Sequence, residues 1–489
     1  MGEANAGGQI LIASNRGPVS FTQGDDGVLT AKRGGGGMVS GLSTVAEDAD
    51  MLWVCAALSD ADRAAARAAP GGVLDHAQAG SGAAVRMLDV PPDIFERAYN
   101  SVANSTLWFV HHMLYDTPNS PSFGPEFAPQ WQAFRSYNEM FASALAAAAA
   151  GRAGSRAVIQ DYHLCLAPRM LADLAPGIQI AHFSHTPWAP PDYFRILPGD
   201  IGRQVLAGIL GADHAGFLCR RWADSFIDCC EALLGADADR ARRQVSYGGH
   251  VTSIGVHPLG VDAAQLRARA AQRDVLTRRA ALTRAADGRK LIVRVDRTEL
   301  SKNIVRGLEA YRELLRTRPE WHGKVEHLAF AYPSRYDLPE YREYTAAVER
   351  LAGQISDEFA VPGWDPLTVE VIDDYPRSLA ACRLADVLLV NPIRDGMNLV
   401  AKEGPVLSDR GCALVLSTEA GAAAELSEYA IMVNPFDVSQ TAQALHEALS
   451  MSDAERTRRS VALADAAASM PPTRWFSDQL RALDRVGVG

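Results

Sequence analysis

The sequence is poor in cysteine and contains no Cys-x-x-Cys pair. Seven cysteines are scattered over 489 residues, an odd number at low density. A disulfide framework and a structural zinc site are therefore both poor interpretations. This cysteine usage is typical of a reducing compartment, and we expect a cytoplasmic protein.

Long hydrophobic runs and an excess of positive charge are also missing. The first apolar run, residues 10–13, is too short for a signal peptide or a membrane span. There are 48 Lys and Arg against 58 Asp and Glu, giving a net charge of −10. This balance excludes a broad nucleic-acid-binding surface and an anionic membrane as partners. It leaves room for a local basic pocket that binds a phosphorylated small molecule.

Short apolar runs alternate with long helical stretches along the chain. Brief apolar runs between turn residues are typical of strands buried on both faces, and helices between them predict parallel sheets. The length suits two or three domains. We predict an α/β fold of two doubly wound, Rossmann-like domains facing each other across a cleft. The runs are 10–13, 157–159, 178–181, 291–295, 369–372, 387–390, 413–416 and 431–433.

A domain boundary is expected near residue 262. Residues 257–262 are punctuated by Pro and Gly, and they precede a stretch rich in Ala and Arg and a new strand at Lys290. The predicted domains are therefore 1–262 and 263–489. The tail, 453–484, is predicted to be helical. The sequence does not decide whether these last helices pack on the second domain or on the first.

The first candidate site follows the first strand. Arg16 lies in the turn after that strand, and Lys32 and Arg33 precede four glycines that include Gly36 and Gly37. Glycines let backbone N–H groups approach an anion, and a helix beginning near Met38 would add partial positive charge. This pattern indicates a phosphate or sugar site, with a flexible surface loop as the alternative.

Polar residues follow two further predicted strands. Asp161 lies in the segment Gln160–His163, and His185 lies in the segment His182–Trp188. The carboxyl ends of parallel strands are where open α/β sheets bind ligands. A catalytic zinc site is a weak alternative, because neither a helical His-x-x-x-His nor an acidic ligand at metal spacing is present.

Two cations follow the strand that opens the second domain. Arg297 and Lys302 are five positions apart across a turn into a helix. Two cations with a helix N-terminus predict a clamp for a diphosphate. The alternative is a solvated loop with internal ion pairs, because Asp296 and Glu299 are close in the sequence.

Two carboxylates follow the strand at 387–390. Asp395 and Glu403 are eight positions apart, one in a loop and the other about two turns into a helix. Such carboxylates suit the hydroxyls of a nucleotide sugar. The alternative is an acidic helix start that only complements the helix dipole.

Together these motifs resemble the trehalose-6-phosphate synthases, retaining glycosyltransferases with the GT-B fold. The likeness runs from about Ile10 to about Met451. The segment from Asp395 to Glu403 and the spacing of Tyr99 and Trp108 are its most specific features.

The resemblance implies roles for individual positions. It makes the first domain acceptor-binding and the second nucleotide-sugar-binding. It places Asp161 on acceptor hydroxyls, His185 near the transferred glucose, Asp395 on the donor glucose and Glu403 on the ribose. The residues implied to bind glucose 6-phosphate are Arg16, Tyr99, Trp108 and Arg335. The further residues implied at the donor are Gly36, Gly37, Arg297 and Lys302, with the backbone of Gly396, Met397, Asn398 and Leu399.

The chain departs from the family pattern at several positions. Residues 297–303 read Arg-Thr-Glu-Leu-Ser-Lys-Asn where many relatives have R-L-D-Y-x-K-G. Residues 185–189 read His-Thr-Pro-Trp-Ala in place of H-I-P-F-P, and the glycine loop carries extra glycines and cations. The cation spacing is kept, so the clamp is expected to persist, while donor and acceptor identity stay open.

The predicted reaction is transfer of glucose from a nucleotide donor to glucose 6-phosphate, which gives trehalose 6-phosphate. Asp161, His185, Arg297 and Lys302 are the expected catalytic residues. No Asp-x-Asp motif stands near the donor segments, so neither a cofactor nor an obligatory metal is expected.

The donor nucleotide is predicted to be GDP rather than UDP. Counting back from Asp395, the family position that holds the base falls at Asp373, beside the predicted strand at 369–372. A carboxylate can accept two hydrogen bonds from guanine, whereas uracil would turn carbonyl oxygens toward it. The alternative is that Asp373 and Asp374 only cap a helix that starts near Pro376.

Other functions remain open from the sequence alone. The chain could be a pseudo-glycosyltransferase of the validoxylamine-phosphate synthase type, or a glucosylglycerol-phosphate synthase. A catalytically inactive sensor of glucose 6-phosphate is a third alternative. The sequence does not fix the oligomeric state, and a homo-oligomer is one option.

Overall fold

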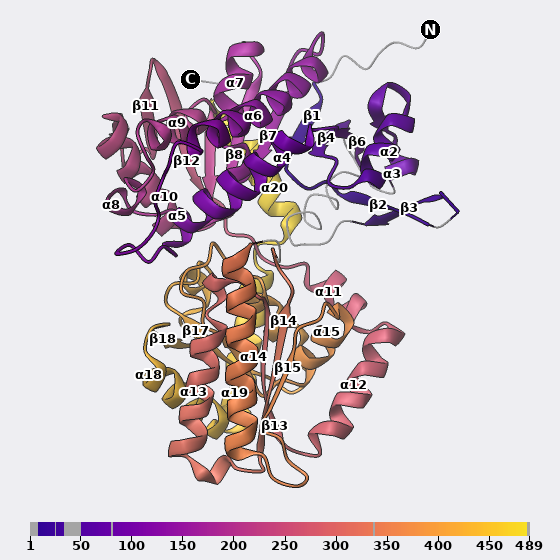
Figure 1. Ribbon diagram of the computed structural model, residues 1–489, viewed down its shortest axis with the longest axis vertical. Coiled ribbons are helices and arrows are strands. Elements are labelled where there is room, and N and C mark those ends of the chain that lie inside the picture. Colours follow the sequence, from indigo (N-terminus) through magenta and orange to yellow (C-terminus); the bar gives the residue numbers. More distant parts are fainter. Residues whose placement is uncertain (1–7, 25, 34–49, 80–81, 336–337, 487–489) are drawn as a thin grey trace. The chain divides into compact units, whose positions relative to one another are not determined.

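The computed structural model describes residues 8–24, 26–33, 50–79, 82–335 and 338–486. The chain divides into two units (Figure 1). The first unit comprises residues up to Pro258 together with Pro472 onward, and the second comprises Leu259–Pro471. Each unit has its own sheet, which is mixed in the first unit and parallel in the second.

The sheet of the first unit has ten strands within the described residues, in the order β10-β11-β12-β9-β8-β7-β1-β4-β6-β5. The strands from β6 across to β12 are parallel to their neighbours. Their chain order reverses between β1 and β7, and open sheets bind ligands at the carboxyl ends beside such a reversal. The bounds are β1 Ile10–Ala13, β4 Met51–Ala56, β5 Val73–Leu74, β6 Ala84–Leu88, β7 Arg156–Gln160, β8 Gln179–Ser184, β9 His214–Phe217, β10 Asp237–Asp239, β11 Gln244–Tyr247 and β12 His250–Val256.

The central strands of this sheet are apolar because helices cover both faces of the sheet. Every residue of β1 and of β4 is buried. A separate antiparallel hairpin is formed by β2 (Val19–Gln23) and β3 (Leu29–Arg33). The helices are α2 Asp60–Ala68, α3 His76–Ala79, α4 Pro92–Phe95, α5 Trp108–His112, α6 Phe127–Ala149, α7 Ala167–Leu174, α8 Pro191–Phe194, α9 Ile201–Ile209, α10 Arg220–Cys229 and α20 Pro472–Val486, with π-helical stretches at Glu96–Leu107 and Cys230–Leu234.

Helix α20 packs on the sheet of the first unit. Its Trp475 is fully buried, and the ring meets Phe183 of β8 edge-on at 4.9 Å. The Gln179 side chain donates to the Leu483 carbonyl at 3.0 Å. The last helix is therefore a structural part of this unit, although 213 residues of the second unit (259 to 471) separate it from β12 and its linker.

The second unit has a sheet of six parallel strands in the described chain, ordered β15-β14-β13-β16-β17-β18. The chain order reverses between β13 and β16, as in a dinucleotide-binding fold. The strands are β13 Lys290–Arg297, β14 Val325–Tyr332, β15 Leu367–Glu370, β16 Val387–Val390, β17 Ala413–Ser417 and β18 Ile431–Val433. The helices are α11 Ala263–Ala270, α12 Arg273–Ala286, α13 Ile304–Thr317, α14 Pro339–Phe359, α15 Tyr375–Leu384, α16 Val400–Leu407, α17 Ala423–Leu426, α18 Val438–Ser450 and α19 Asp453–Ala468.

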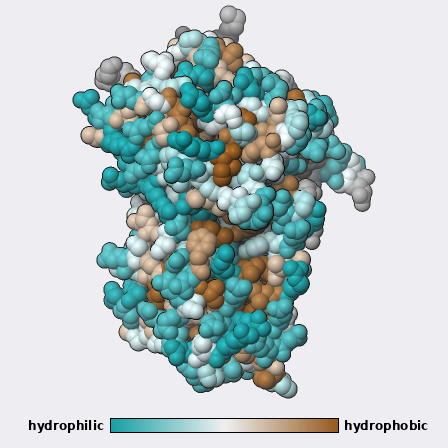
Figure 2. Space-filling view, turned by 60° about the vertical axis from the view of Figure 1, so that its left-hand side comes forward, coloured by the Kyte–Doolittle hydropathy of each residue, from teal (hydrophilic) through white to brown (hydrophobic). Residues whose placement is uncertain are grey.

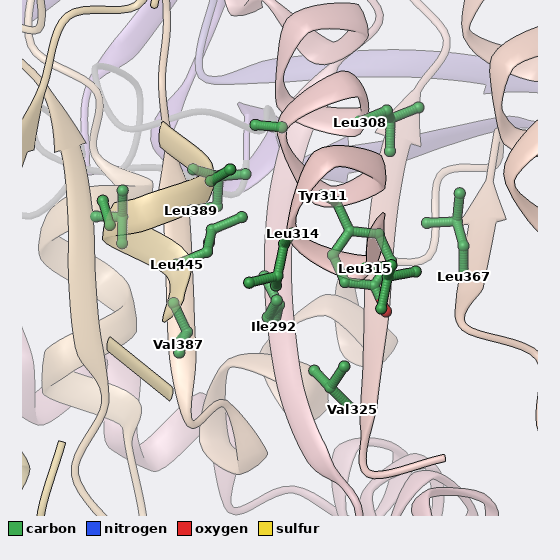
Figure 3. Packing of buried hydrophobic residues seen from close by; sticks show 14 of the residues in the cluster. Ile292, Leu308, Tyr311, Leu314, Leu315, Val325, Leu367, Val387, Leu389 and Leu445 are labelled. Atoms are coloured by element: carbon green, nitrogen blue, oxygen red, sulfur yellow. The ribbon is translucent and has the colours of Figure 1, made fainter. Parts of the chain in front are cut away.

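The main core of the second unit lies between its sheet and helices α13, α14 and α18 (Figure 3). Tyr311 and Leu314 of α13 pack over Ile292 of β13, and Leu445 of α18 joins the same cluster. All of these side chains are fully buried. This packing holds β13 rigidly, so that the residues following it have a fixed starting point.

The surface is mostly hydrophilic, and apolar residues are scattered over it (Figure 2). Among the described residues, no helix is both long and apolar enough to cross a bilayer. All seven cysteines are buried, and none forms a disulfide.

One strand lies earlier than the sequence predicts. We expected a strand at 369–372, whereas β15 spans Leu367–Glu370. Leu367–Glu370 pairs with His327–Phe330 of β14, and Ile372 is 57% exposed. The prediction was wrong because apolar character continues beyond the point where backbone pairing ends.

Candidate active site

The carboxyl ends of β7 and β8 carry polar groups that bond to one another. The backbone N–H of His185 donates to Oδ1 of Asp161 at 3.1 Å. The His185 Nε2 lies 2.8 Å from Oε1 of Gln160, and the Asp161 N–H donates to the Phe183 carbonyl at 2.7 Å. The structure thus brings Asp161 and His185 together beside the strand-order reversal of the first unit.

Asp161 has an unusual backbone conformation. Its φ is 73° and its ψ is 169°, a region that is essentially reserved for glycine. Holding another residue there costs about 1–3 kcal/mol, and such outliers cluster at functional sites. The two bonds between Asp161 and the end of β8 maintain this conformation, which makes Asp161 the first functional candidate of this unit.

His185 is held as a neutral ring. Burial lowers its pKa to about 3, and the neighbouring His182 adds to the shift. Since the Gln160 Oε1 is an acceptor, the His185 Nε2 carries the proton and donates to it. The Trp475 ring lies 5.6 Å from the imidazole, so the last helix helps to fix its plane. A neutral ring of fixed orientation suits hydrogen bonding better than proton transfer.

Aromatic rings stack near these strand ends. Tyr99 stacks on His163 at 5.6 Å, and Trp108 stacks on His112 at 3.8 Å. Tyr99 belongs to the π-helical stretch Glu96–Leu107, and Trp108 follows it directly. Extended π-helical segments are rare and occur often at functional sites. Of the two residues that the sequence selected, Tyr99 thus lies on this π-helical stretch and Trp108 begins α5 directly after it.

The turn after β1 is fixed while its arginine remains exposed. Ser14 Oγ donates to the Arg16 carbonyl at 2.6 Å and accepts from Trp53 Nε1 at 2.7 Å. Tyr137 donates its hydroxyl proton to Asn15 Oδ1 at 2.6 Å. Arg16 itself is exposed. Gly36 and Gly37, the predicted phosphate-loop glycines, lie outside the described residues.

The second unit carries a cluster of charges at the end of β13. Arg297 Nη1 lies 3.1 Å from Glu299 Oε1, and Lys302 Nζ lies 2.5 Å from Asp395 Oδ2. Burial alone would lower the pKa of Lys302, but Asp395, Asp296 and Glu299 raise it above its ordinary value. Lys302 is therefore a stable cation at the strand-order reversal of this unit.

Buried polar residues that the sequence reasoning missed fix the Lys302 turn. Arg294, 1% exposed, donates to the Lys302 carbonyl at 2.9 Å. Asn303 donates through Nδ2 to the carbonyls of Asn391, at 3.0 Å, and Pro435, at 2.7 Å. Asn303 has a φ of 58°, and Asn is one of the few residues that tolerate this region. In the sequence, only the Asn that directly follows Lys302 could have indicated this fixed turn.

The segment Asp395–Leu399 leads into α16. Asn398 Nδ2 donates to Asp395 Oδ2 at 3.2 Å, and Asn398 has a φ of 74°. A Cβ at Gly421 would lie 1.8 Å from the Gly396 carbonyl oxygen, so only glycine fits there. The loop that carries Gly421 and the turn that carries Lys302 thus both contact this segment, and Asp395 pairs with Lys302.

Glu403 is a half-buried acid in the first turn of α16, rather than two turns into the helix. Burial raises its pKa from 4.5 to about 7. Within the described chain, its carboxylate has no ion-pair or hydrogen-bond partner. A partly desolvated carboxylate without a partner is costly, and a ligand with hydroxyl donors would relieve that cost.

Arg335 lies after β14, and thus in the second unit. Its Nη1 donates to the Tyr341 hydroxyl at 2.6 Å. Together with Arg297 it lowers the pKa of Glu299, against the effect of burial. The structure therefore groups Arg335 with the predicted diphosphate clamp.

The two aspartates after β15 differ in their surroundings. Asp374 caps α15, accepting from the Arg377 N–H at 3.0 Å, and lies 2.8 Å from Arg278 Nε. Asp373 is exposed, and no hydrogen bond or ion pair engages it among the described residues. Capping therefore accounts for Asp374, and Asp373 remains available to a ligand.

Comparisons with known proteins identify relatives over nearly the whole chain. The model described as Glycosyltransferase family 20 matches residues 8–485. The chain is 33% identical over 391 residues to a bifunctional trehalose-6-phosphate synthase/phosphatase of Thermoproteus tenax. That match covers 79% of this chain and 52% of the relative, so the chain spans about half of that protein's length.

Two further relatives match over most of their own length. Validamine 7-phosphate valienyltransferase of Streptomyces hygroscopicus is 30% identical over 485 residues, which cover 98% of this chain and 94% of that protein. The UDP-forming alpha,alpha-trehalose-phosphate synthase of Schizosaccharomyces pombe is 30% identical over 463 residues, with coverages of 93% and 86%.

A solved structure from E. coli, described as trehalose-6-phosphate bound with UDP-2-fluoro glucose, has the same fold. Its TM-score is 0.85 at 26% identity, and the match covers 98% of this chain and 99% of that chain.

Proposed function

Because the chain belongs to glycosyltransferase family 20, we propose that it transfers glucose from a nucleotide donor to glucose 6-phosphate, forming trehalose 6-phosphate. It has the GT-B fold and is a glycosyltransferase of the trehalose-phosphate synthase type. The observation that carries the proposal is the pairing of half-buried Lys302 with Asp395 at 2.5 Å, beside Arg297, where the strand order reverses.

In the proposed reaction, the bond from the glucose anomeric carbon to the donor phosphate breaks. The acceptor hydroxyl forms the new bond on the same face, and the departing phosphate oxygen takes the hydroxyl proton. Arg297 and Lys302 stabilise the negative charge that develops on the diphosphate, as preorganised electrostatics. Asp161 and His185 orient the acceptor and the transferred glucose. The low pKa of His185 supports this orienting role.

The proposed donor site is built from Asp395 on the glucose, Glu403 on the ribose and Asp373 on the base. Asp373 is exposed and the neighbouring Asp374 is already engaged by Arg278 and by its own helix. A carboxylate in this place favours guanine, which offers two N–H donors. We propose GDP-glucose as the preferred donor, although relatives are named UDP-forming.

A donor panel with glucose 6-phosphate, with product read by mass, tests this proposal. We expect kcat/KM for GDP-glucose to exceed that for UDP-glucose by about tenfold or more, the value of one charge-assisted pair. Asp373→Ala should narrow the gap, because it removes the acceptor for guanine. Asp357→Ala, at an exposed aspartate on α14, is the matched control and should leave the ratio unchanged. Equal or better kcat/KM with UDP-glucose in the unmodified enzyme would contradict the guanine assignment.

A pseudo-glycosyltransferase is the second candidate function. The valienyltransferase relative matches 98% of this chain at 30% identity, the same identity as the yeast synthase. Such an enzyme would join a cyclitol from a nucleotide donor to an aminocyclitol phosphate. Adding a nucleotide-linked cyclitol and an aminocyclitol phosphate to the same panel separates the two functions.

We further propose that no divalent metal is obligatory, because Arg297 and Lys302 supply the positive charge that a metal would supply. Treating the enzyme with an excess of EDTA, followed by desalting, should then leave at least about half of the activity. Full loss of activity that magnesium or manganese restores would contradict a metal-independent clamp.

A further inference from the structure

Glu299 is a buried carboxylate among three cations of the second unit. Its side chain is 0% exposed, and Oε1 accepts a hydrogen bond from Ser334 Oγ at 2.9 Å. Burial alone would raise its pKa, but Arg297, Arg335 and Lys302 lower it to about 2. Glu299 is therefore ionised at any physiological pH.

Glu299 determines the direction of the Arg297 side chain. The Arg297 side chain is 52% exposed, and Glu299 provides its one ion pair among the described residues, at 3.1 Å through Nη1. A half-exposed arginine without a partner would sample many rotamers. Holding one nitrogen leaves the other N–H groups of the fork available to a bound anion.

Glu299 also joins two loops of the proposed site. Ser334, which donates to Glu299, directly precedes Arg335. The carboxylate thus connects the turn after β13, which carries Arg297 and Lys302, to the segment after β14, which carries Arg335. Its second oxygen, Oε2, is buried without a hydrogen-bond partner. Such a group is costly to keep, which favours a role in the site over a role in stability.

We propose that Glu299 is a positioning residue that aims Arg297 at the donor diphosphate and offsets part of the positive charge that would retain the diphosphate product. The inference rests on the proposed function, because Arg297 is given its role there. A negative charge a few ångströms from a bound diphosphate weakens its binding, since this site is partly screened from water. The same charge fixes the arginine that stabilises the leaving group.

The test is steady-state kinetics of the full chain with its preferred nucleotide-glucose and glucose 6-phosphate. GDP and UDP serve as product inhibitors. Glu299→Gln keeps an acceptor oxygen and removes the charge, so we expect kcat to fall about tenfold or more while the product inhibition constant falls at least about threefold. Glu299→Asp keeps the charge with a shorter reach, so kcat should fall while the inhibition constant stays within about twofold of the unmodified enzyme.

Glu326→Gln is the matched control. Glu326 lies near the start of β14, pairs with Arg289 at 3.7 Å and is largely buried, at the opposite end of the strand from Ser334. It should change neither constant. A Glu299→Gln enzyme with kcat within about twofold of the unmodified enzyme would overturn the positioning role.

If Glu299→Gln bound GDP or UDP more weakly and also had a lower kcat, the proposal would be overturned, because a damaged site loses both product binding and turnover. If Glu299→Gln does not fold, the test rests on Glu299→Asp. A lower kcat with an unchanged product inhibition constant in that variant then supports the proposal. An unmodified enzyme that binds GDP or UDP but transfers no glucose would instead refute the proposed function. The shift of the binding constant in Glu299→Gln would still test the charge effect.

Discussion

Replacing Lys302 with alanine is expected to lower kcat by about 10²–10³-fold, the range found when one preorganised donor to a developing anion is removed. The Lys302 ammonium lies 2.5 Å from Asp395, and the Lys302 side chain is 15% exposed, so water cannot readily replace its charge. Its loss also leaves Asp395 without its cation. Turnover should fall even at saturating donor, because the interaction strengthens as the diphosphate leaves.

The control for this variant is Lys290→Ala. Lys290 lies at the opposite end of β13, and its Nζ donates to the Leu449 carbonyl at 2.6 Å. Losing that bond should lower thermal stability slightly and leave kcat unchanged. A loss of less than about tenfold in Lys302→Ala, roughly 1.4 kcal/mol, would show that Lys302 does not stabilise the leaving group.

The second large effect is expected in the pH dependence of stability. Burial raises the pKa of Glu403 from 4.5 to about 7. Between these values the folded state binds more protons than the unfolded state, so the free energy of unfolding falls as the pH rises. Below pH 4.5 the Glu403 carboxyl is protonated in both states, so the free energy of unfolding is not reduced. Above pH 7 the free energy of unfolding is reduced by the full amount, about 3 kcal/mol.

Glu403→Gln should abolish this loss, because glutamine does not ionise. Urea unfolding at pH 5 and pH 8 should show the unmodified chain losing about 2–3 kcal/mol relative to the variant. Glu349→Gln, at an exposed position of α14, should follow the unmodified chain at both values. Parallel behaviour of Glu403→Gln and the unmodified chain would show that the carboxylate is not desolvated as described. A saturating nucleotide sugar should reduce the difference, since hydroxyl donors favour the ionised form.

The sequence identifies eight of the eighteen described strands, namely β1, β7, β8, β13, β15, β16, β17 and β18, and it misses others that include β4 and β14. Strands such as β16, with four buried residues, appear as apolar runs because they lie inside the sheet. Arg297 and Asp395 could be selected because chemistry at the carboxyl end of a strand follows it directly in the chain. Strand ends were less well placed: β15 ends at Glu370, before the apolar residues that continue into an exposed turn, and β8 continues to Ser184 beyond the predicted end at residue 181.

The environment of each group was harder to predict. The alternative to the clamp placed Glu299 in a solvated loop with internal ion pairs; Glu299 does pair with Arg297, but it is fully buried. Trp475 contacts His185 although 290 positions separate them, and no local pattern marks such a contact. Burial and long-range packing arise from the assembled unit, so a sequence window does not contain them.

The position of α20 has a consequence for how the chain is made. The ribosome must synthesise all of Leu259–Pro471 before Trp475 emerges to cover Phe183. At typical elongation rates this takes on the order of ten to forty seconds. Throughout that interval the sheet of the first unit lacks its last helix, and it still lacks it when the second unit has just been completed. Nascent chains should therefore present a site for chaperones on β8, and ribosome stalling within the second unit should prolong its exposure.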